Sequence, residues 1–210
     1  MLKLLGKLFN KDLTTPSEPI DTNVSMDEIW EILHPSDKAV LSRKKKNLRL
    51  FLQFITSHLK KSEAQRLTRV AVKALDELDG SFDEYSSFSA LSEIISGEDG
   101  QKRGQWMFIQ IDWKAYDEIA WQVTEIISLY GIEDEWTLTK STQYSDALKA
   151  LKNLSEWLQN KGFTLIHLET GGDWYCSFII KASNLAAVKE LATAAELKIY
   201  DQDEFAIQNT

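Results

Sequence analysis

One stretch of the chain, HLETGGDWYCSFII at 167–180, gathers the side chains that enzymes use most. It holds His167, the carboxylates Glu169 and Asp173, and Cys176, which is the only cysteine of the sequence. Carboxylates with an imidazole form a ligand set for zinc, manganese or iron, and paired carboxylates divide the roles of general acid and general base. The first question is therefore whether this stretch is catalytic or is the turn of a β-hairpin.

The residue pattern favours the hairpin. Gly171-Gly172 is a recognised hairpin-turn pair, and it separates two runs that are typical of strands. Cys176 lies inside an apolar strand pattern, which favours a small buried hydrophobe over a nucleophile. Neither HExxH nor a cysteine pair occurs anywhere in the sequence. We therefore predict no catalytic residue, no metal site and no cofactor, and retain a hydrolase as the alternative.

The elements that position this stretch follow from the spacing of apolar residues. The periodicity predicts strands at 106–113, 136–140, 163–170, 174–182 and 198–201, and helices at 115–131, 144–161 and 185–196. Without the 136–140 insertion the order is β-α-β-β-α-β. This order predicts a ferredoxin-like domain at 104–210, built of two layers, with a sheet covered by helices on one face.

In that topology the first strand and the 163–170 strand run in the same direction, and the next strand returns between them. Their carboxyl ends therefore lie at one rim of the sheet, which collects Asp112, Glu169 and Asp173. His167 and Glu169 are two residues apart on one strand and point to the same face. The alternative function, a metal-dependent or acid–base hydrolase, uses these four residues.

The first half of the chain is predicted to be helical. The patterns predict helices at 26–34, 37–61, 63–79 and 82–96. Residues 25–97 are therefore predicted to form a helical subdomain, and the α+β fold class follows from the two halves together. The polar, glycine-containing loop 98–104 marks the boundary.

Residues 1–24 are predicted to form a basic amphipathic helix followed by a linker with two prolines. Leucines on one face and lysines beside them predict weak peripheral membrane contact through residues 1–11. The competing interpretation is that this helix docks on the helical subdomain. No apolar run is long enough to span a bilayer, and one cysteine requires no oxidising compartment. The expected localisation is the cytoplasm, with contact at the inner membrane.

The net charge of −8 is unevenly distributed. Residues 38–73 hold eleven Lys or Arg residues and one Glu, a net charge of +10, and the remaining residues hold 13 basic and 31 acidic groups, a net charge of −18. The basic patch of the first region is Arg43, Lys44, Lys45, Lys46 and Arg49. It is interpreted either as a solvated helix face or as a site for an anionic partner, including the protein's own acidic half. Nucleic acid is not expected, because the chain is acidic and no binding motif accompanies the patch.

The acidic half carries the main functional prediction. Residues 104–210 hold eight basic and sixteen acidic residues, and Trp121 lies on a polar face of its predicted helix. Such a tryptophan marks either an interface or a surface that the N-terminal helices cover. The preferred function is a non-catalytic interaction domain, immunity-like or regulatory, that binds a basic protein partner. Its candidate interaction residues are Asp112, Asp117, Glu118, Trp121, Glu133, Asp134, Glu135, Trp136, Glu169 and Asp173.

Three motifs resemble an uncharacterised bacterial family. They are IDWKAYDEIAWQV at 111–123, a WL-x-x-KGF turn at 157–163 and HLETGGDWYCSFII at 167–180. Over about residues 106–200 the chain is similar to the family catalogued as domain of unknown function 6630. The matching motif residues are Asp112, Trp113, Asp117, Glu118, Gly171, Gly172 and Asp173. The resemblance implies a bacterial cytoplasmic domain and carries no activity with it.

Overall fold

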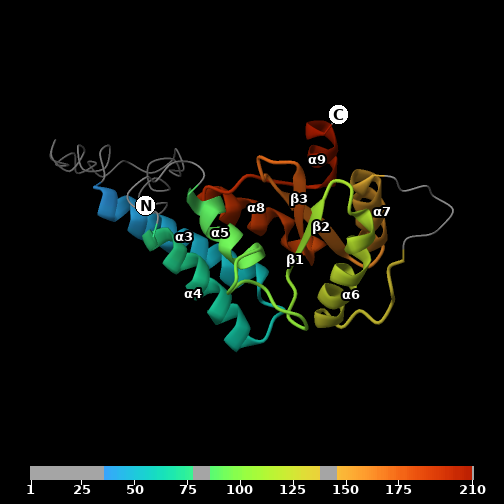
Figure 1. Cartoon of the computed structure of the whole chain (residues 1–210), viewed down its shortest axis with the longest axis horizontal. Helices are drawn as coiled ribbons and strands as arrows, with labels where there is room; N and C mark the ends of the chain where they lie inside the picture. The colour runs from blue at the N-terminus through green and yellow to red at the C-terminus, as the bar shows by residue number, and fades with distance from the viewer. Residues whose placement is uncertain (1–35, 78–85, 138–145, 210) are drawn as a thin grey trace, which may run out of the picture. The chain divides into compact units, whose positions relative to one another are not determined.

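A four-stranded antiparallel sheet organises the fold of the computed structural model (Figure 1). Its strands are β1 (Phe108–Asp112), β2 (Phe163–Leu168), β3 (Trp174–Lys181) and β4 (Ile199–Tyr200), in the order β1-β3-β2-β4. Since β3 pairs antiparallel with both β1 and β2, the two outer strands of this trio run in the same direction. The predicted direction of these strands, with β3 returning between the other two, is confirmed.

The ferredoxin-like arrangement is not confirmed. In that arrangement the last strand lies beside the first, whereas here β4 pairs with β2 through His167 and Leu168. The outer edge of β1 is occupied instead by two glutamine side chains. Gln101 bonds to the backbone of Phe108, and Gln122 bonds to the backbone of Gln110.

Helices cover both faces of the sheet. The structure describes residues 36–77, 86–137 and 146–209. Within them the helices are α3 (Asp37–Ile55), α4 (Lys61–Glu77), α5 (Ser86–Ile95), α6 (Ile119–Leu129), α7 (Ala147–Gln159), α8 (Leu185–Ala194) and α9 (Gln202–Gln208), with 3-10 turns at Tyr116–Glu118 and Ala182–Asn184. Figure 1 shows α3, α4, α5 and α8 on one side of the sheet and α6 and α7 on the other.

Two apolar clusters correspond to these two faces. Alternate residues of β3 divide between them: Cys176, Phe178 and Ile180 join the cluster with α3, α4, α5 and α8, and Ile179 joins the cluster with α6 and α7. This alternation is the period of two that a strand imposes on its side chains. The predicted two-layer architecture, with helices on one face only, is wrong, because the first three described helices pack on the face that it left open.

The helical half and the sheet half share a core. Leu48, Phe51, Leu52 and Ile55 recur along α3 at helical spacing and are buried in the same cluster as Phe178 of β3. Polar contacts follow the same route: Lys44 pairs with Glu196, which follows α8, and Asn47 donates to the carbonyl of Ala194 at 2.6 Å. The chain from Asp37 onward is accordingly one compact unit, and the loop 98–104 is a connection inside it.

Most predicted elements occur near their predicted bounds, with one addition. Helix α9 was not predicted, although its start carries a capping box: the Asp201 carboxylate accepts from the Glu204 amide, and the Glu204 carboxylate accepts from the Asp201 amide. The predicted segments 1–24 and 26–34, and most of the predicted edge strand 136–140, lie outside the described residues. None of the described helices is long and apolar enough to cross a membrane.

Candidate functional site

The only histidine of the 167–180 stretch is buried in a hydrogen-bonded network. His167 is fully inaccessible to solvent, and its ring stacks on Phe205 of α9 with a centroid separation of 3.8 Å. Its Nε2 lies 3.2 Å from the amide oxygen of Gln202, and its Nδ1 lies 2.8 Å from the hydroxyl of Ser177. Because the amide oxygen only accepts, Nε2 carries the proton and the Ser177 hydroxyl donates to Nδ1. Burial lowers the pKa of His167 to about 4, so the ring is neutral at pH 7.

This serine–histidine pair has the hydrogen bond of an activated nucleophile but not its surroundings. Ser177 is fully buried in β3, which is bonded to a strand on each side, so neighbouring backbone N–H groups are engaged in the sheet. A nucleophile needs an accessible oxygen and free donors for the developing oxyanion. Cys176, beside it, is also buried, and burial raises the pKa of its thiol far above the usual range. The network therefore stabilises the sheet.

The carboxylates of the predicted rim lie at one end of the sheet but not on one face. Asp112 pairs with Trp174, whose ring contacts Phe88 of α5. His167 pairs with Ser177 on the opposite face, beneath α9. Since directly paired residues of antiparallel strands share a face, the register separates Asp112 from His167 by the thickness of the sheet. Within the described ranges, no three His, Cys, Asp or Glu side chains are arranged to hold a metal ion.

Glu169 and the glycine pair form the hairpin turn, as the sequence predicts. Gly171 has a φ of 66°, a conformation that favours glycine, and its amide donates to the Glu169 carboxylate at 3.0 Å. The other oxygen of that carboxylate accepts from the Tyr200 hydroxyl at 3.0 Å. Glu169 thus ties the turn to β4 and lines a cavity of only about 130 Å³. Asp173 is exposed at the end of the turn.

Three exposed acidic residues of the predicted set lie at the end of β1 and at the start of the following 3-10 turn and helix. Asp112, Asp117 and Glu118 are exposed, and Trp113 between them has 50% of its surface accessible. The Asp112 carboxylate accepts from the Lys114 amide at 3.0 Å, and the Lys114 ammonium lies 4.4 Å from the centre of the Trp113 ring. We refer to these five residues as the β1–α6 corner. Its carboxylates form no ion pair with any described residue, although that of Glu118 accepts from the Trp121 indole N–H. Its tryptophan is half exposed beside Lys114.

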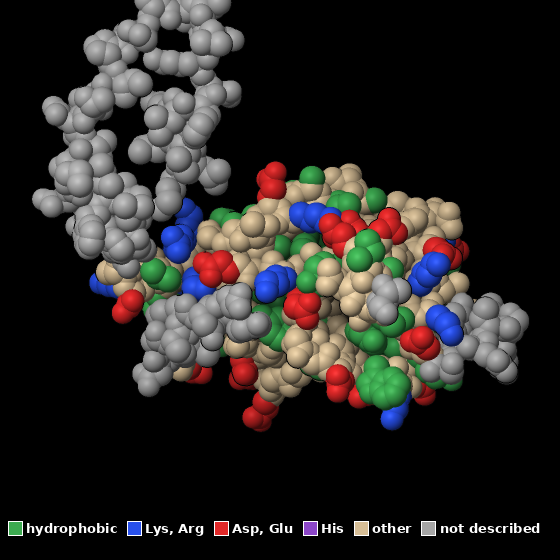
Figure 2. Space-filling model, turned by 90° about the horizontal axis from the view of Figure 1, so that it is seen from above, with side chains coloured by type: hydrophobic (Ala, Val, Ile, Leu, Met, Phe, Trp, Pro, Cys, Tyr) green, Lys and Arg blue, Asp and Glu red, His purple; other side chains and the backbone are tan. Residues whose placement is uncertain are grey.

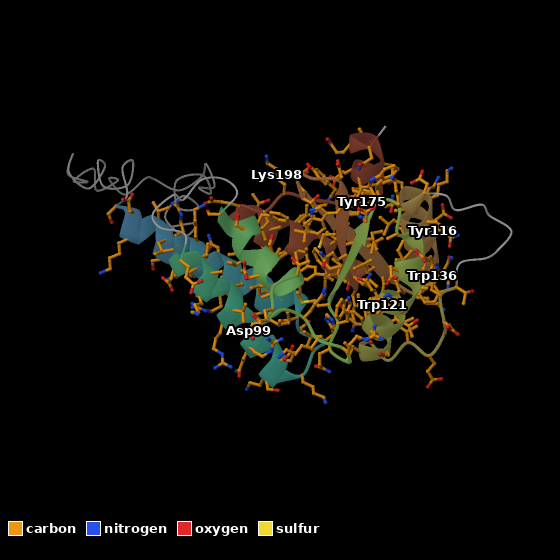
Figure 3. The ribbon with its side chains drawn as sticks, in the orientation of Figure 1. Asp99, Tyr116, Trp121, Trp136, Tyr175 and Lys198 are labelled. Atoms are coloured by element: carbon orange, nitrogen blue, oxygen red, sulfur yellow. The ribbon has the colours of Figure 1, made fainter. Side chains whose placement is uncertain are left out.

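Trp121 is covered within the chain, although not by the N-terminal helices that one of its two interpretations named. It lies on α6, where Figure 3 labels it, and it is covered by the segment before β1. Its ring packs against Trp106 at 5.0 Å, and the Arg103 guanidinium lies 4.2 Å above it. Arg103 is held there by Glu125 at 2.6 Å. The half-buried Trp121 is thus accounted for by an intramolecular contact.

The predicted cluster at 133–136 contains three exposed carboxylates and one buried tryptophan. Glu133, Asp134 and Glu135 are exposed, and Asp134 pairs with Lys161. Trp136, also labelled in Figure 3, is only 2% exposed, and its Nε1 donates to Asn153 of α7 at 3.1 Å. The prediction of Trp136 as an interaction residue is wrong, because its ring is part of the core between α6 and α7.

The predicted basic patch is only partly available to a partner. Lys44 is 3% exposed and pairs with Glu196, and Lys45 pairs with Asp76 of α4. The remaining three, Arg43, Lys46 and Arg49, are exposed. Figure 2 shows acidic and basic side chains interspersed over the face that it draws. The charge division along the sequence is therefore partly neutralised within the fold, with Lys44 facing the protein's own acidic half.

One cavity of the described residues was not foreseen. A groove of about 550 Å³ lies between α3 and α4, and its lining includes Arg49, Lys61 and Arg69. Only Arg49 belongs to the predicted patch. The sequence signal for Lys61 and Arg69 was their position in the basic region 38–73. Which cations of that region line one groove depends on how α3 and α4 pack together.

A family model described as "Domain of unknown function (DUF6630)" matches residues 25–203, so the chain belongs to this family. The resemblance inferred over residues 106–200 is correct in its family and too short in its extent, since the match includes the region of α3, α4 and α5. The comparisons with curated proteins and with solved structures gave no match.

Proposed function

We propose that this member of the DUF6630 family is a non-catalytic interaction domain that binds a basic protein partner through its acidic half, with the β1–α6 corner at the centre of the contact. The observation that carries the proposal is the exposed Trp113 among the carboxylates of Asp112, Asp117 and Glu118. The side chains of the chain best suited to chemistry, His167 and Cys176, are buried.

Charge supports a basic partner. Residues 104–210 carry twice as many acidic as basic residues, sixteen against eight. Exposed carboxylates at the edge of a contact mainly accelerate association and suppress partners of like charge. The unpaired Asp117, Glu133 and Glu135 are available for this role among the described residues.

Trp113 supports a protein contact in particular. Tryptophan is enriched among the residues that contribute most to binding, because a large rigid ring fills a pocket at small cost in conformational entropy. Lys114 covers one part of the ring in the free protein. A partner that offers a basic side chain of its own can replace Lys114 over the ring, where a cation interacts favourably.

The test begins with the full chain immobilised and exposed to a soluble extract of the native host at low and high salt. A protein retained at low salt is purified, and its association and dissociation rates are measured with variants of the corner. We expect Asp117→Asn with Glu118→Gln to lower the association rate and Trp113→Ala to raise the dissociation rate. The matched control is Glu156→Gln with Glu190→Gln, which removes two exposed charges from α7 and α8.

Retention of no protein counts against the proposal. So does a partner whose association rate falls equally with the corner pair and with the control pair, because that result assigns binding to net charge alone. A partner that is insensitive to Trp113→Ala excludes the corner as the centre of the contact.

The hydrolase alternative has less support. It requires Asp112, His167, Glu169 and Asp173 to act together, but His167 is inaccessible and Asp112 belongs to the other face of the sheet. General acid–base catalysis requires the base to reach the proton that it abstracts.

The proposed setting is the bacterial cytoplasm, with weak membrane contact through residues 1–11. The support is the composition of that segment, which lies outside the described residues. Sedimentation with anionic vesicles tests it: the full chain should pellet more than a chain beginning at Asp21. Equal sedimentation of the two at low salt removes the membrane proposal and leaves the interaction domain unaffected.

A further inference from the structure

The groove between α3 and α4 is lined by positively charged side chains. Figure 1 shows the two helices side by side, and the groove opens between them near the turn that joins them. Three cations line it: Arg49 from α3, and Lys61 and Arg69 from α4. Among the described residues, its lining contains no Asp or Glu. A concave surface of one charge concentrates ions of the opposite charge.

Several cations of α3 and α4 have carboxylate partners, and the cations of the groove have none among the described residues. In the described ranges at least seven other Lys or Arg side chains form ion pairs, and three of these pairs involve the same two helices: Lys45 with Asp76, Arg66 with Glu63, and Lys73 with Glu77. Arg49, Lys61 and Arg69 form none with any described residue. Three unpaired cations around one cavity repel one another. An anion bound among them would relieve this repulsion.

The uncharged residues of the described lining supply hydrogen-bond donors but no aromatic ring. The hydroxyls of Thr56 and Thr68 already donate to the carbonyls of Leu52 and Ala64, at 2.6 and 2.7 Å. The other donors of the described lining belong to the three cations, the exposed Ser57 hydroxyl and the exposed amides of Gln53 and Gln65. Of these, the Nε of Arg69 already donates to the Gln65 carbonyl at 3.3 Å. No aromatic side chain belongs to the lining, so the described groove offers a nucleobase no stacking surface.

We propose that this groove binds a small phosphate-bearing molecule. Its volume lies within the range of about 300–1,000 Å³ typical of small-molecule sites. Two guanidinium groups and one ammonium match the oxygens of a phosphate, because the planar fork of arginine binds such oxygens in pairs. A concave site with three cations suits a compact multivalent anion better than the flat surface of a membrane. The proposal does not depend on the acidic corner, which lies on other elements.

The experiment uses the full chain and two probes, inorganic pyrophosphate and inorganic phosphate, with binding measured by isothermal titration calorimetry at low ionic strength. We expect pyrophosphate to bind with one-to-one stoichiometry and more tightly than phosphate. Arg49→Gln and Arg69→Gln should each weaken pyrophosphate binding about tenfold, because each removes one charged hydrogen-bond donor. The matched control is Lys46→Gln, which removes one exposed positive charge from α3 outside the groove lining.

Three results overturn the proposal: no heat of binding with pyrophosphate, equal weakening by Lys46→Gln, or a stoichiometry well above one. Anionic vesicles provide the comparison with a lipid source. If the chain beginning at Asp21 binds phosphatidylglycerol vesicles through Arg49 and Arg69 but does not bind pyrophosphate, the cations serve a membrane and the small-molecule site is wrong. The three substituted side chains, Arg49, Arg69 and Lys46, are exposed, and circular dichroism verifies that each variant is folded.

Discussion

The side chain of Gln122 takes the place of a neighbouring strand for Gln110. Its Oε1 accepts from the Gln110 amide at 2.8 Å, and its Nε2 donates to the Gln110 carbonyl at 2.9 Å. Gln101 repeats the arrangement at Phe108, accepting from its amide at 2.8 Å and donating to its carbonyl at 3.2 Å. The outward-facing amide and carbonyl groups of Phe108 and Gln110 on β1 are thereby hydrogen-bonded. An edge strand without such cover is a template for pairing with another chain.

Replacing Gln122 by Leu should therefore destabilise the protein by more than the loss of a single side-chain hydrogen bond would. Gln122 is 2% exposed, so the released backbone groups of Gln110 remain shielded from water. We expect the free energy of unfolding to fall by about 2–3 kcal/mol, the cost of leaving buried polar groups without partners. Urea denaturation measures this change.

The same variant should self-associate, and light scattering after size exclusion would detect it. Gln159→Leu is the control, because Gln159 is exposed at the end of α7 and should have little effect on stability. If the two variants are equally stable and equally monodisperse, the amide of Gln122 has no protective role at the strand edge.

Truncation of two tryptophans should change the stability of the protein to very different extents. Trp136→Ala removes a 2% exposed ring and its bond to Asn153, and should lower the free energy of unfolding by about 3–5 kcal/mol. Trp113→Ala removes a ring that is half exposed and should change stability by less than about 1 kcal/mol. Urea denaturation of both variants measures the two changes in the free energy of unfolding. A large loss with Trp113→Ala would contradict its assignment as a surface available to a partner.

Acid should weaken the fold through His167. The ring remains neutral in the folded protein until the pH approaches about 4, whereas in the unfolded chain it titrates near 6.5. As the pH falls between these values the unfolded chain binds a proton that the folded protein does not, so the free energy of unfolding decreases. From pH 7 to pH 5 this one group should remove about 2 kcal/mol, and His167→Gln should abolish its contribution.

His58 provides the comparison for that experiment. Its ring stacks on Tyr130 at 4.3 Å, and burial lowers its pKa to about 4 as well. Each single substitution should therefore reduce the decline in stability between pH 7 and pH 5, and the double substitution should reduce it further. A His167→Gln variant that retains the full decline of the parent protein would show that the buried network does not resist protonation.

Neighbouring lysines of α3 should differ sharply in their effect on stability. Lys44→Ala deletes a buried side chain that pairs with the partly exposed Glu196, and we expect a loss of about 1–3 kcal/mol. Lys46→Ala deletes an exposed side chain and should be neutral within about 0.5 kcal/mol. Thermal unfolding of the two variants at one pH makes the comparison. Equal melting temperatures would mean that Lys44 contributes nothing between α3 and the end of α8.

The sequence by itself determined the elements and their local geometry. Apolar spacing along α3, α4 and α7 predicts helices because a period of 3.6 aligns those side chains on one face. The Gly171-Gly172 pair predicts the hairpin because Gly171 adopts a positive φ, and the direction of the first three strands followed from their order. Even α9, which was not predicted, has its local signal in the Asp201 and Glu204 capping box.

The tertiary structure decided which faces meet and which charges remain unpaired. Trp113 and Trp136 both adjoin carboxylates in the sequence, yet one is exposed and the other is buried, because Trp136 joins the apolar cluster that contains residues of α6 and α7. Lys44 and Lys46 differ for the same reason, since α8 covers one side of α3 and leaves the other open. Burial depends on contacts between residues far apart in the chain, and a local pattern holds no information about the partner that will cover it.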